Sequence, residues 1–188
     1  MTSTLRPAFV MLVAMTFVTG VVYPALVTVG AKSLFPAKAE GSILTAPDGT
    51  VIGSALIGQS FTDAKHFFGR PSATTPQPNN GLGSGGSNLG PTNPALVDAV
   101  KSRLAAVKDA SSADPVPIDL VTASASGLDP EISLAAALYQ IPRVAKARGI
   151  DAAQLQALVE KHTKGPQLGF LGPARVNVVE LNIDLDDR

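Results

Sequence analysis

The sequence predicts an α+β protein with a single N-terminal transmembrane helix, followed by one mixed α/β soluble domain with a small sheet and about three helices. Three observations support this prediction. An uncharged apolar stretch lies near the N-terminus, segments rich in β-forming residues alternate with segments of helical periodicity, and 188 residues suffice for one ordinary domain. We expect a tail at residues 1–6, a transmembrane helix at 7–31 and a soluble domain at 32–188.

The predicted transmembrane helix comprises the 25 uncharged residues between Arg6 and Lys32. With a rise of about 1.5 Å per residue it would extend roughly 37 Å, which exceeds a hydrocarbon core of about 30 Å. A cleaved signal peptide is the alternative, because Gly30 and Ala31 are small residues near a potential cleavage point. The apolar region of a signal peptide is usually about 7–15 residues long, which favours a retained anchor. The flanking positive charges do not decide the orientation.

Charge and composition exclude several classes of function. Fifteen basic and fifteen acidic residues give a net charge of zero without any basic cluster, so nucleic acid is not an expected partner. The sequence contains no cysteine, which excludes disulfides, thiolate nucleophiles and cysteine-based zinc sites.

The first half of the soluble domain is predicted from turn and helix signals. Residues 41–59 contain a Pro-Asp-Gly turn between segments rich in β-forming side chains, and they predict a hairpin. Residues 69–94 are rich in Gly, Pro, Asn and Ser without apolar periodicity, so they predict a long loop. Asn93 and Pro94 then provide an N-cap and a first-turn proline for a helix that extends to about residue 108.

The second half is predicted to contain two strands and two helices. We expect a short strand at 117–122 and a helix at about 129–148, which starts at an Asp-Pro pair. Pro142 is expected to kink or divide that helix, because proline removes one main-chain hydrogen bond. Capping residues and an apolar stripe predict a third helix at 151–164, and β-branched residues predict a terminal strand at 175–183.

No catalytic site is recognisable in the sequence. It contains no P-loop and lacks the Asp-Lys-Thr-Gly-Thr loop that carries the phosphorylated aspartate of P-type pumps. A serine nucleophile needs a base, and both histidines, His66 and His162, are predicted to be surface residues. Asp184, Asp186 and Asp187 could hold a cation, but carboxylates at a chain end are more often solvated. We therefore predict neither catalytic residues nor a metal site.

Three glycines in the long loop match a phosphate-binding pattern. Gly81, Gly83 and Gly86 have GxGxxG spacing, which allows a main chain to wrap a pyrophosphate at a helix N-terminus. A dinucleotide fold requires a strand immediately before this pattern, and here the preceding residues are PQPNN at 76–80. The match is therefore weak evidence for nucleotide binding.

Ser87, Asn88 and Asn93 are the candidate cofactor-binding residues of the same loop. A phosphate cradle would require free amides that point at a ligand, whereas a structural loop uses its amides internally and on partner surfaces. We expect the structural and partner role, in which Ser87 and Asn88 hydrogen-bond nearby main chain and Asn93 caps the following helix.

Several segments, taken in order, match a known pattern. They are TGVVYP at 19–24, FGRPS at 68–72, SGGSNLGPTNP at 84–94, LVTASASGLDP at 120–130, LGFLG at 168–172 and RVNV at 175–178, together with Gln140, Arg143 and Arg148. Over nearly its whole length the chain thereby resembles the KdpC family, the C chain of the high-affinity potassium-transporting ATPase. It departs from that family at Glu131, where the family has histidine, and at Pro173 and Ala174, where it has Glu-Pro.

The resemblance implies an accessory subunit without catalytic activity of its own. Its partners would be a channel-like potassium-translocating subunit, a P-type catalytic subunit and a small membrane peptide. The resemblance implies no covalently bound cofactor. The family is described as raising the ATP affinity of the catalytic subunit, so ATP would act through the complex. The expected location is the cytoplasmic (inner) membrane, crossed once, with residues 32–188 as a soluble accessory domain on the outer face.

Two alternatives remain open on the residues alone. A membrane-anchored extracytoplasmic hydrolase would use a serine with His66 or His162, although the strand–turn–helix context of a nucleophilic serine is missing. An anchored solute-binding domain would bind a small ligand at exposed amides of residues 81–93.

Overall fold

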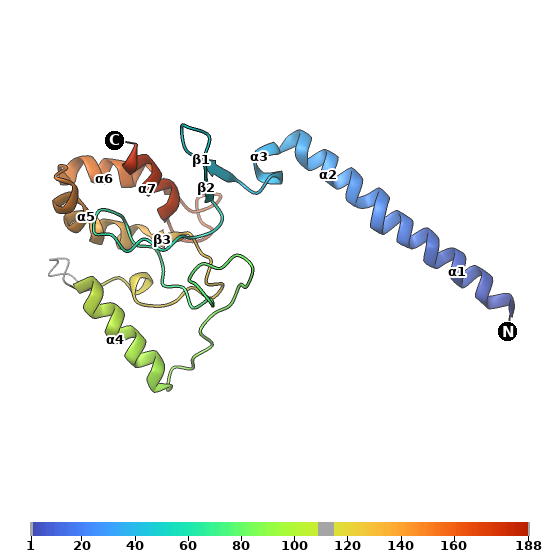
Figure 1. The fold of residues 1–188 in the computed structure, drawn as a ribbon, viewed down its shortest axis with the longest axis horizontal. Coiled ribbons are helices and arrows are strands. Elements are labelled where there is room, and N and C mark those ends of the chain that lie inside the picture. The colour runs from blue at the N-terminus through green and yellow to red at the C-terminus, as the bar shows by residue number, and fades with distance from the viewer. Residues whose placement is uncertain (1, 109–114, 188) are drawn as a thin grey trace. The chain divides into compact units, whose positions relative to one another are not determined.

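A computed structural model of the chain describes residues 2–108 and 115–187 (Figure 1). The chain divides into two compact units, Met1–Ser54 and Ala55–Arg188, which we call the N-terminal and C-terminal units. Helices and short strands occur in both units, so the predicted mixed α/β architecture is confirmed.

The N-terminal unit begins with a long apolar helix. It comprises α1 (Thr2–Phe17), a π-helical turn (Val18–Val22) and α2 (Tyr23–Leu34). The π-helical turn ends two residues before Pro24, which lacks the amide that an α-helix would use at that position. From Thr4 to Leu34 the helix is 31 residues long and contains an 18-residue window with a mean hydropathy of 2.1, and its side chains are exposed rather than buried in a protein core. By length and composition it can cross a membrane.

The predicted hairpin follows the helix and is confirmed. A short helix, α3 (Pro36–Ala39), leads into β1 (Ile43–Thr45), which pairs antiparallel with β2 (Val51–Ser54). Gly49 has φ +85°, a value that glycine adopts without strain at the tip of the turn. β2 ends at Ser54, so the segment after it, which also contains β-forming residues, does not continue the strand.

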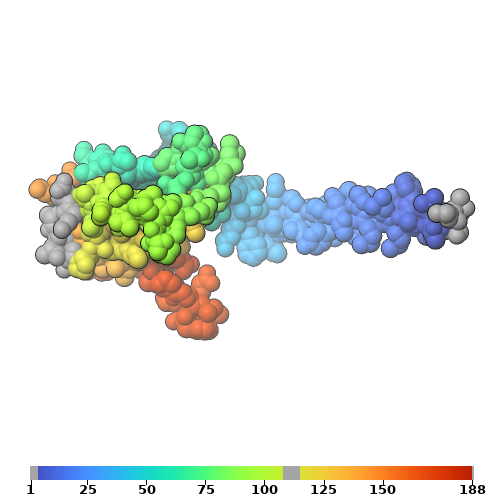
Figure 2. Space-filling view, turned by 90° about the horizontal axis from the view of Figure 1, so that it is seen from below, coloured from blue at the N-terminus to red at the C-terminus, as the bar shows by residue number. Residues whose placement is uncertain are grey.

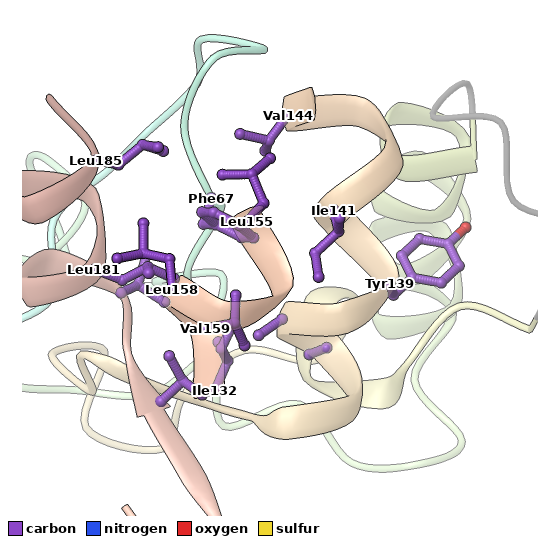
Figure 3. Packing of buried hydrophobic residues seen from close by; sticks show 14 of the residues in the cluster. Phe67, Ile132, Tyr139, Ile141, Val144, Leu155, Leu158, Val159, Leu181 and Leu185 are labelled. Atoms are coloured by element: carbon purple, nitrogen blue, oxygen red, sulfur yellow. The ribbon is translucent and has the colours of Figure 1, made fainter. Parts of the chain in front are cut away.

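In its described residues, the C-terminal unit packs four α-helices and a small sheet around one core (Figures 1 and 3). The helices are α4 (Pro94–Lys108), α5 (Leu134–Arg148), α6 (Ala152–Lys161) and α7 (Val178–Asp186). The antiparallel sheet has the order β3 (Glu131–Ser133), β5 (Arg175–Asn177), β4 (Thr163–Lys164). Leu155 and Leu158 of α6 meet Leu181 and Leu185 of α7 in the core. Beside them lies the buried ring of Phe67, which belongs to the segment between β2 and α4 that we call the long loop.

The long loop and the helix after it are confirmed. No helix or strand occurs between Ser54 and Pro94, which includes the whole loop predicted at 69–94. The Asn93 side chain accepts a hydrogen bond from the Ala95 amide at 3.0 Å and so caps α4, as predicted. Such a cap contributes about 1 kcal/mol.

The strand predicted at 117–122 is wrong. Ile118–Leu120 forms a single 3-10 turn after Pro117. The Asp119 carboxylate accepts a hydrogen bond from the Ser133 amide at 2.7 Å. The turn therefore places Asp119 next to the first residue before α5. The residues 117–122 by themselves do not predict this contact, because Ser133 lies 14 positions from Asp119.

The helix predicted from the Asp-Pro pair starts later than expected. Asp129 accepts a hydrogen bond from the Glu131 amide at 3.0 Å, and Glu131–Ser133 then pairs with β5 as a strand. Ser133 is the N-cap of α5, because its hydroxyl accepts from the Ala136 amide at 3.1 Å. α5 continues past Pro142 without division, and the carbonyl that loses its donor belongs to the exposed Leu138.

The predicted third helix is also shorter than expected. α6 begins after the capping residue Asp151, as predicted, but it ends at Lys161 instead of Lys164. Thr163 and Lys164 pair with β5 as an edge strand, so sheet hydrogen bonds replace the last helical turn.

The terminal strand predicted at 175–183 is wrong beyond Asn177. The Asn177 side chain accepts hydrogen bonds from two amides of the next turn, at 3.0 and 3.1 Å, and starts α7. Val178, Leu181 and Leu185 are buried at helical spacing. The cap and this buried stripe outweigh the strand propensity of the β-branched residues.

Candidate functional site

The long loop is held to the helical core by two buried side-chain amides. The Phe67 amide donates to Asn182 Oδ1, and Asn182 Nδ2 donates back to the Phe67 carbonyl, both at 2.9 Å. The Phe68 amide donates to Gln140 Oε1 at 2.7 Å, and Gln140 Nε2 donates back to the Phe68 carbonyl at 3.1 Å. Each carboxamide thus pairs with a loop residue as a neighbouring strand would. These residues fix the loop without any regular secondary structure.

Two arginines extend this attachment. Arg143 donates to the carbonyls of Ala64 and His66, at 2.7 and 2.8 Å, and its guanidinium stacks 3.7 Å from the centre of the Phe68 ring. Burial lowers the pKa of Arg143 to about 10, so it remains charged at neutral pH. Arg148 donates to the Lys65 carbonyl at 2.7 Å. Gln140, Arg143 and Arg148, which carry part of the family resemblance, therefore have a structural function in this unit.

The two Gly- and Ser-rich segments that carry most of the resemblance lie side by side. The Gly85 amide donates to the Ser126 carbonyl at 2.9 Å, and the Ser84 hydroxyl donates to the same carbonyl at 3.0 Å. A Cβ atom on Gly86 would lie 2.8 Å from the Ala125 carbonyl oxygen. Close main-chain packing therefore accounts for Gly86 without a phosphate ligand.

The three candidate residues of the loop have different environments. Asn93 caps α4. Ser87 and Asn88 are exposed, and among the described residues their side chains make no hydrogen bond, so the expected bonds to nearby main chain are not formed. Asn88 has φ +51°, in the left-handed region that asparagine tolerates. The loop thus presents two polar side chains to the surroundings.

The two histidines form pairs with two of the C-terminal carboxylates, which corrects one expectation. His162 lies 2.8 Å from Asp184, and His66 lies 3.0 Å from Asp186; both histidines are partly exposed, and each is paired with a carboxylate. Asp184 also accepts a hydrogen bond from Lys161, and Asp186 one from Arg148. Asp184 and Asp186 are therefore paired rather than only solvated, whereas Asp187 is exposed. Among the described residues, no group of three His, Cys, Asp or Glu side chains could hold a metal ion.

Asp184 gives the C-terminal unit a measurable acid dependence. Hydrogen bonds from Lys161 and then His162 lower the pKa of Asp184 to about 2. Because the pKa in the folded state is below the unfolded value of about 3.9, the stabilisation is present above pH 4 and lost as pH falls towards 2. We expect Asp184→Asn to melt at a lower temperature than the unsubstituted chain at pH 7. Between pH 4 and 2 its melting temperature should fall by less than that of the unsubstituted chain. An unchanged acid profile by circular dichroism would contradict this.

Residues 165–172 form a projecting turn, which we call the apolar finger (Figure 2, orange-red). Two main-chain hydrogen bonds of 2.9 Å join Gln167 and Leu171 at its base. Leu168 and Phe170 at its tip are 83% and 75% exposed, and the eight residues contain no charged side chain. In the sequence this feature is an apolar segment between two Gly-Pro pairs. That pattern does not predict that the segment projects from the unit.

The tip of the apolar finger is conformationally strained. Leu168 has φ +53°, a left-handed conformation that is unfavourable for a bulky residue. Its side chain is exposed, so burial within the described chain does not offset this strain. Strained residues that expose apolar side chains are typical of contact surfaces.

Comparisons with known proteins identify the family. The family model described as "KdpC: K+-transporting ATPase, c chain" matches residues 5–187. A protein of Variovorax paradoxus (strain S110) named "Potassium-transporting ATPase KdpC subunit" is 57% identical over 188 residues, which cover 99% of this chain and 97% of the other.

Two further relatives with the same name agree with this match over full length. The protein of Methylibium petroleiphilum is 55% identical over 190 residues, covering 100% of this chain and 99% of the other. That of Janthinobacterium sp. (strain Marseille) is 53% identical over 190 residues, covering 100% of both chains. With a family match over nearly all residues, the chain belongs to the KdpC family, the c chain of K+-transporting ATPases.

Proposed function

We propose that this chain is an accessory, non-hydrolysing subunit of an ATP-driven potassium import complex. The observation that carries the proposal is the full-length similarity to proteins named as KdpC subunits of a potassium-transporting ATPase. The sequence supports it, because it contains neither a P-loop nor the aspartyl-phosphate loop of P-type pumps. One apolar helix cannot enclose a pore, so potassium would pass through another subunit.

The proposed partners are a channel-like potassium-translocating subunit, a P-type catalytic subunit and a small membrane peptide. The chain would support their assembly and raise the ATP affinity of the catalytic subunit. Binding of ATP to the catalytic subunit and binding of this chain to the complex would then be coupled reciprocally, without ATP touching this chain. The chain would carry no covalently bound cofactor.

The hydrolase alternative has less support from the described residues. A serine nucleophile requires a hydrogen-bonded base, and both histidines hydrogen-bond aspartates. Neither histidine hydrogen-bonds a serine within residues 2–108 and 115–187.

We place the C-terminal unit on the outer face of the cytoplasmic membrane, with the apolar helix crossing it once. On this proposal, protease added to sealed spheroplasts should remove an epitope fused after the last residue. A cytoplasmic protein serves as the control and should stay intact until the spheroplasts are lysed. An epitope protected to the same extent as that control would place the unit on the inner face.

The apolar finger is the surface that we assign to subunit contact. Leu168 and Phe170 would fill an apolar pocket of a partner subunit, and burial there would offset the strain at Leu168. Ser87 and Asn88 form a second, polar contact on the exposed loop.

The finger can be tested with a substitution that separates folding from assembly. Leu168→Gly relieves the backbone strain of about 1–2 kcal/mol at position 168, so the melting temperature of the chain should not fall. The same substitution removes the apolar side chain that would contact the partner subunit. We expect this variant and Phe170→Ser to reduce the recovery of partner subunits roughly tenfold in mild detergent. Leu82→Ser is the matched control, because Leu82 is 100% exposed elsewhere in the unit.

A smaller reduction is expected when Ser87 and Asn88 are both replaced by Ala, since polar contacts at an interface rim contribute little. Equal recovery of partner subunits with Leu168→Gly, Phe170→Ser and Leu82→Ser would show that the finger is not a subunit contact.

A further inference from the structure

The C-terminal unit contains a cavity of about 460 Å³ between the long loop and α4. Its volume falls in the range of sites for small molecules, about 300–1,000 Å³. Phe61, Phe68 and Leu120 supply apolar walls, and Ser60, Ser72 and Asn79 supply polar groups. An apolar cavity with a few polar groups is the usual composition of a ligand site.

The charged residues that line this cavity are both arginines. Arg70 and Arg103 lie on its wall, and no carboxylate is found among the described residues that line it. Arg70 forms an ion pair with Asp129 at 3.0 Å. Arg103 donates to the Val121 carbonyl at 3.1 Å, and within the described part of the chain it forms no ion pair. The cavity wall therefore carries one guanidinium that no carboxylate of residues 2–108 or 115–187 pairs with.

The side chain of Arg70 is not fully satisfied either. Its Nε is buried and has no hydrogen-bond partner among the described residues. A buried N–H without an acceptor is unfavourable, so such a group indicates a missing partner. Guanidinium groups prefer planar carboxylates, with which they form two parallel charge-assisted hydrogen bonds.

We propose that this cavity binds a carboxylate attached to an apolar group. The carboxylate would lie at the guanidinium of Arg103, on the wall that Arg70 also lines, while the apolar group would contact Phe61, Phe68 and Leu120. The carboxylate belongs either to a small free molecule or to a side chain of another subunit. Both sources present the same chemistry to the two arginines.

Benzoate is the probe, because it joins a carboxylate to one aromatic ring, and benzamide is its uncharged counterpart. Calorimetric titration of the full chain in non-ionic detergent should show saturable one-to-one binding of benzoate. Benzoate should bind at least about tenfold more tightly than benzamide, because charge-assisted hydrogen bonds are stronger than neutral ones. The wild-type comparison does not depend on the folding of any variant.

Arg103→Gln removes the unmatched charge and should abolish the preference for benzoate. Lys101→Gln is the matched control, since Lys101 is an exposed cation on the same helix outside the cavity wall. Equal affinity for benzoate and benzamide, no saturable benzoate binding up to 10 mM (roughly −3 kcal/mol), or a preference that survives in Arg103→Gln would each overturn the proposal.

The two sources of the carboxylate are distinguished by repeating the titration on the chain within its complex. Retained benzoate binding identifies a site for a free molecule, and loss of binding on assembly identifies a carboxylate of another subunit. Both outcomes support the carboxylate site. The titration of the isolated chain remains valid even if the proposed assembly fails.

Discussion

Replacing Asn182 by Leu is expected to lower the free energy of unfolding of the C-terminal unit by about 2–6 kcal/mol. Asn182 satisfies both the amide and the carbonyl of the buried Phe67, at 2.9 Å each. Leucine has a similar volume but leaves both main-chain groups without a partner, and each such group costs about 1–3 kcal/mol. Unfolding in urea, followed by circular dichroism of the chain in non-ionic detergent, measures the change.

Gln156→Leu is the control for this substitution, because Gln156 is an exposed amide whose side chain bonds only Glu160 among the described residues. We expect Gln156→Leu to change the free energy of unfolding by less than about 0.5 kcal/mol. If Asn182→Leu lowers the free energy of unfolding by no more than Gln156→Leu does, the side-chain amide of Asn182 does not hold the long loop in place.

Replacing Gly127 by Ala is expected to cost about 2–5 kcal/mol. Gly127 has φ +68°, and an added Cβ would lie 2.5 Å from Thr74 Cγ2 and 2.7 Å from the Gly85 carbonyl oxygen. The left-handed conformation costs an alanine about 1–2 kcal/mol, and overpacking adds about 1–3 kcal/mol. The substitution would separate the two Gly- and Ser-rich segments that carry the family pattern.

Gly149→Ala is a closely matched control. Gly149 caps α5 with φ +69°, almost the value at Gly127, but an added Cβ there would meet nothing within 4 Å. Its replacement should therefore cost only the conformational part, about 1–2 kcal/mol. If both variants lower the free energy of unfolding in urea by the same amount, close packing around Gly127 does not contribute to the stability of the unit.

Local signals were sufficient where the deciding contacts are close in sequence. Asn93 and Pro94 predicted the start of α4, because the cap and the first-turn proline act on adjacent amides. The hairpin followed in the same way from its turn residues. The uncharged stretch before Lys32 predicted the apolar helix, because length and hydropathy alone determine whether a helix can cross a membrane.

Elements that depend on distant partners were predicted wrongly. Residues 131–133 form a strand only because β5 supplies hydrogen-bond partners more than 40 residues later. The residues after Asn177 are rich in strand formers, but the packing of α7 against α6 selects a helix. The period of Val178, Leu181 and Leu185 was the available signal, and an analysis for helical spacing would have found it.

The candidate site was predicted in part. Asn93 was assigned its cap, but the attachment of the loop through Asn182 and Gln140 could not be predicted, because these residues lie 115 and 72 positions from their partners, respectively. The sequence also gave no indication that Leu168 would adopt φ +53° at an exposed tip. Long-range hydrogen bonds and backbone strain appear only once the chain is folded.

Co-purification shows whether this chain functions as a subunit of a potassium-transporting ATPase. The full chain, tagged after its last residue, is extracted from its native membrane in mild non-ionic detergent and recovered by the tag. We expect two larger membrane proteins in the recovered material and potassium-stimulated ATP hydrolysis, both of which decrease when Leu168→Gly is used. A well-folded chain recovered alone, without larger membrane proteins or ATPase activity, would show that the chain is not such a subunit.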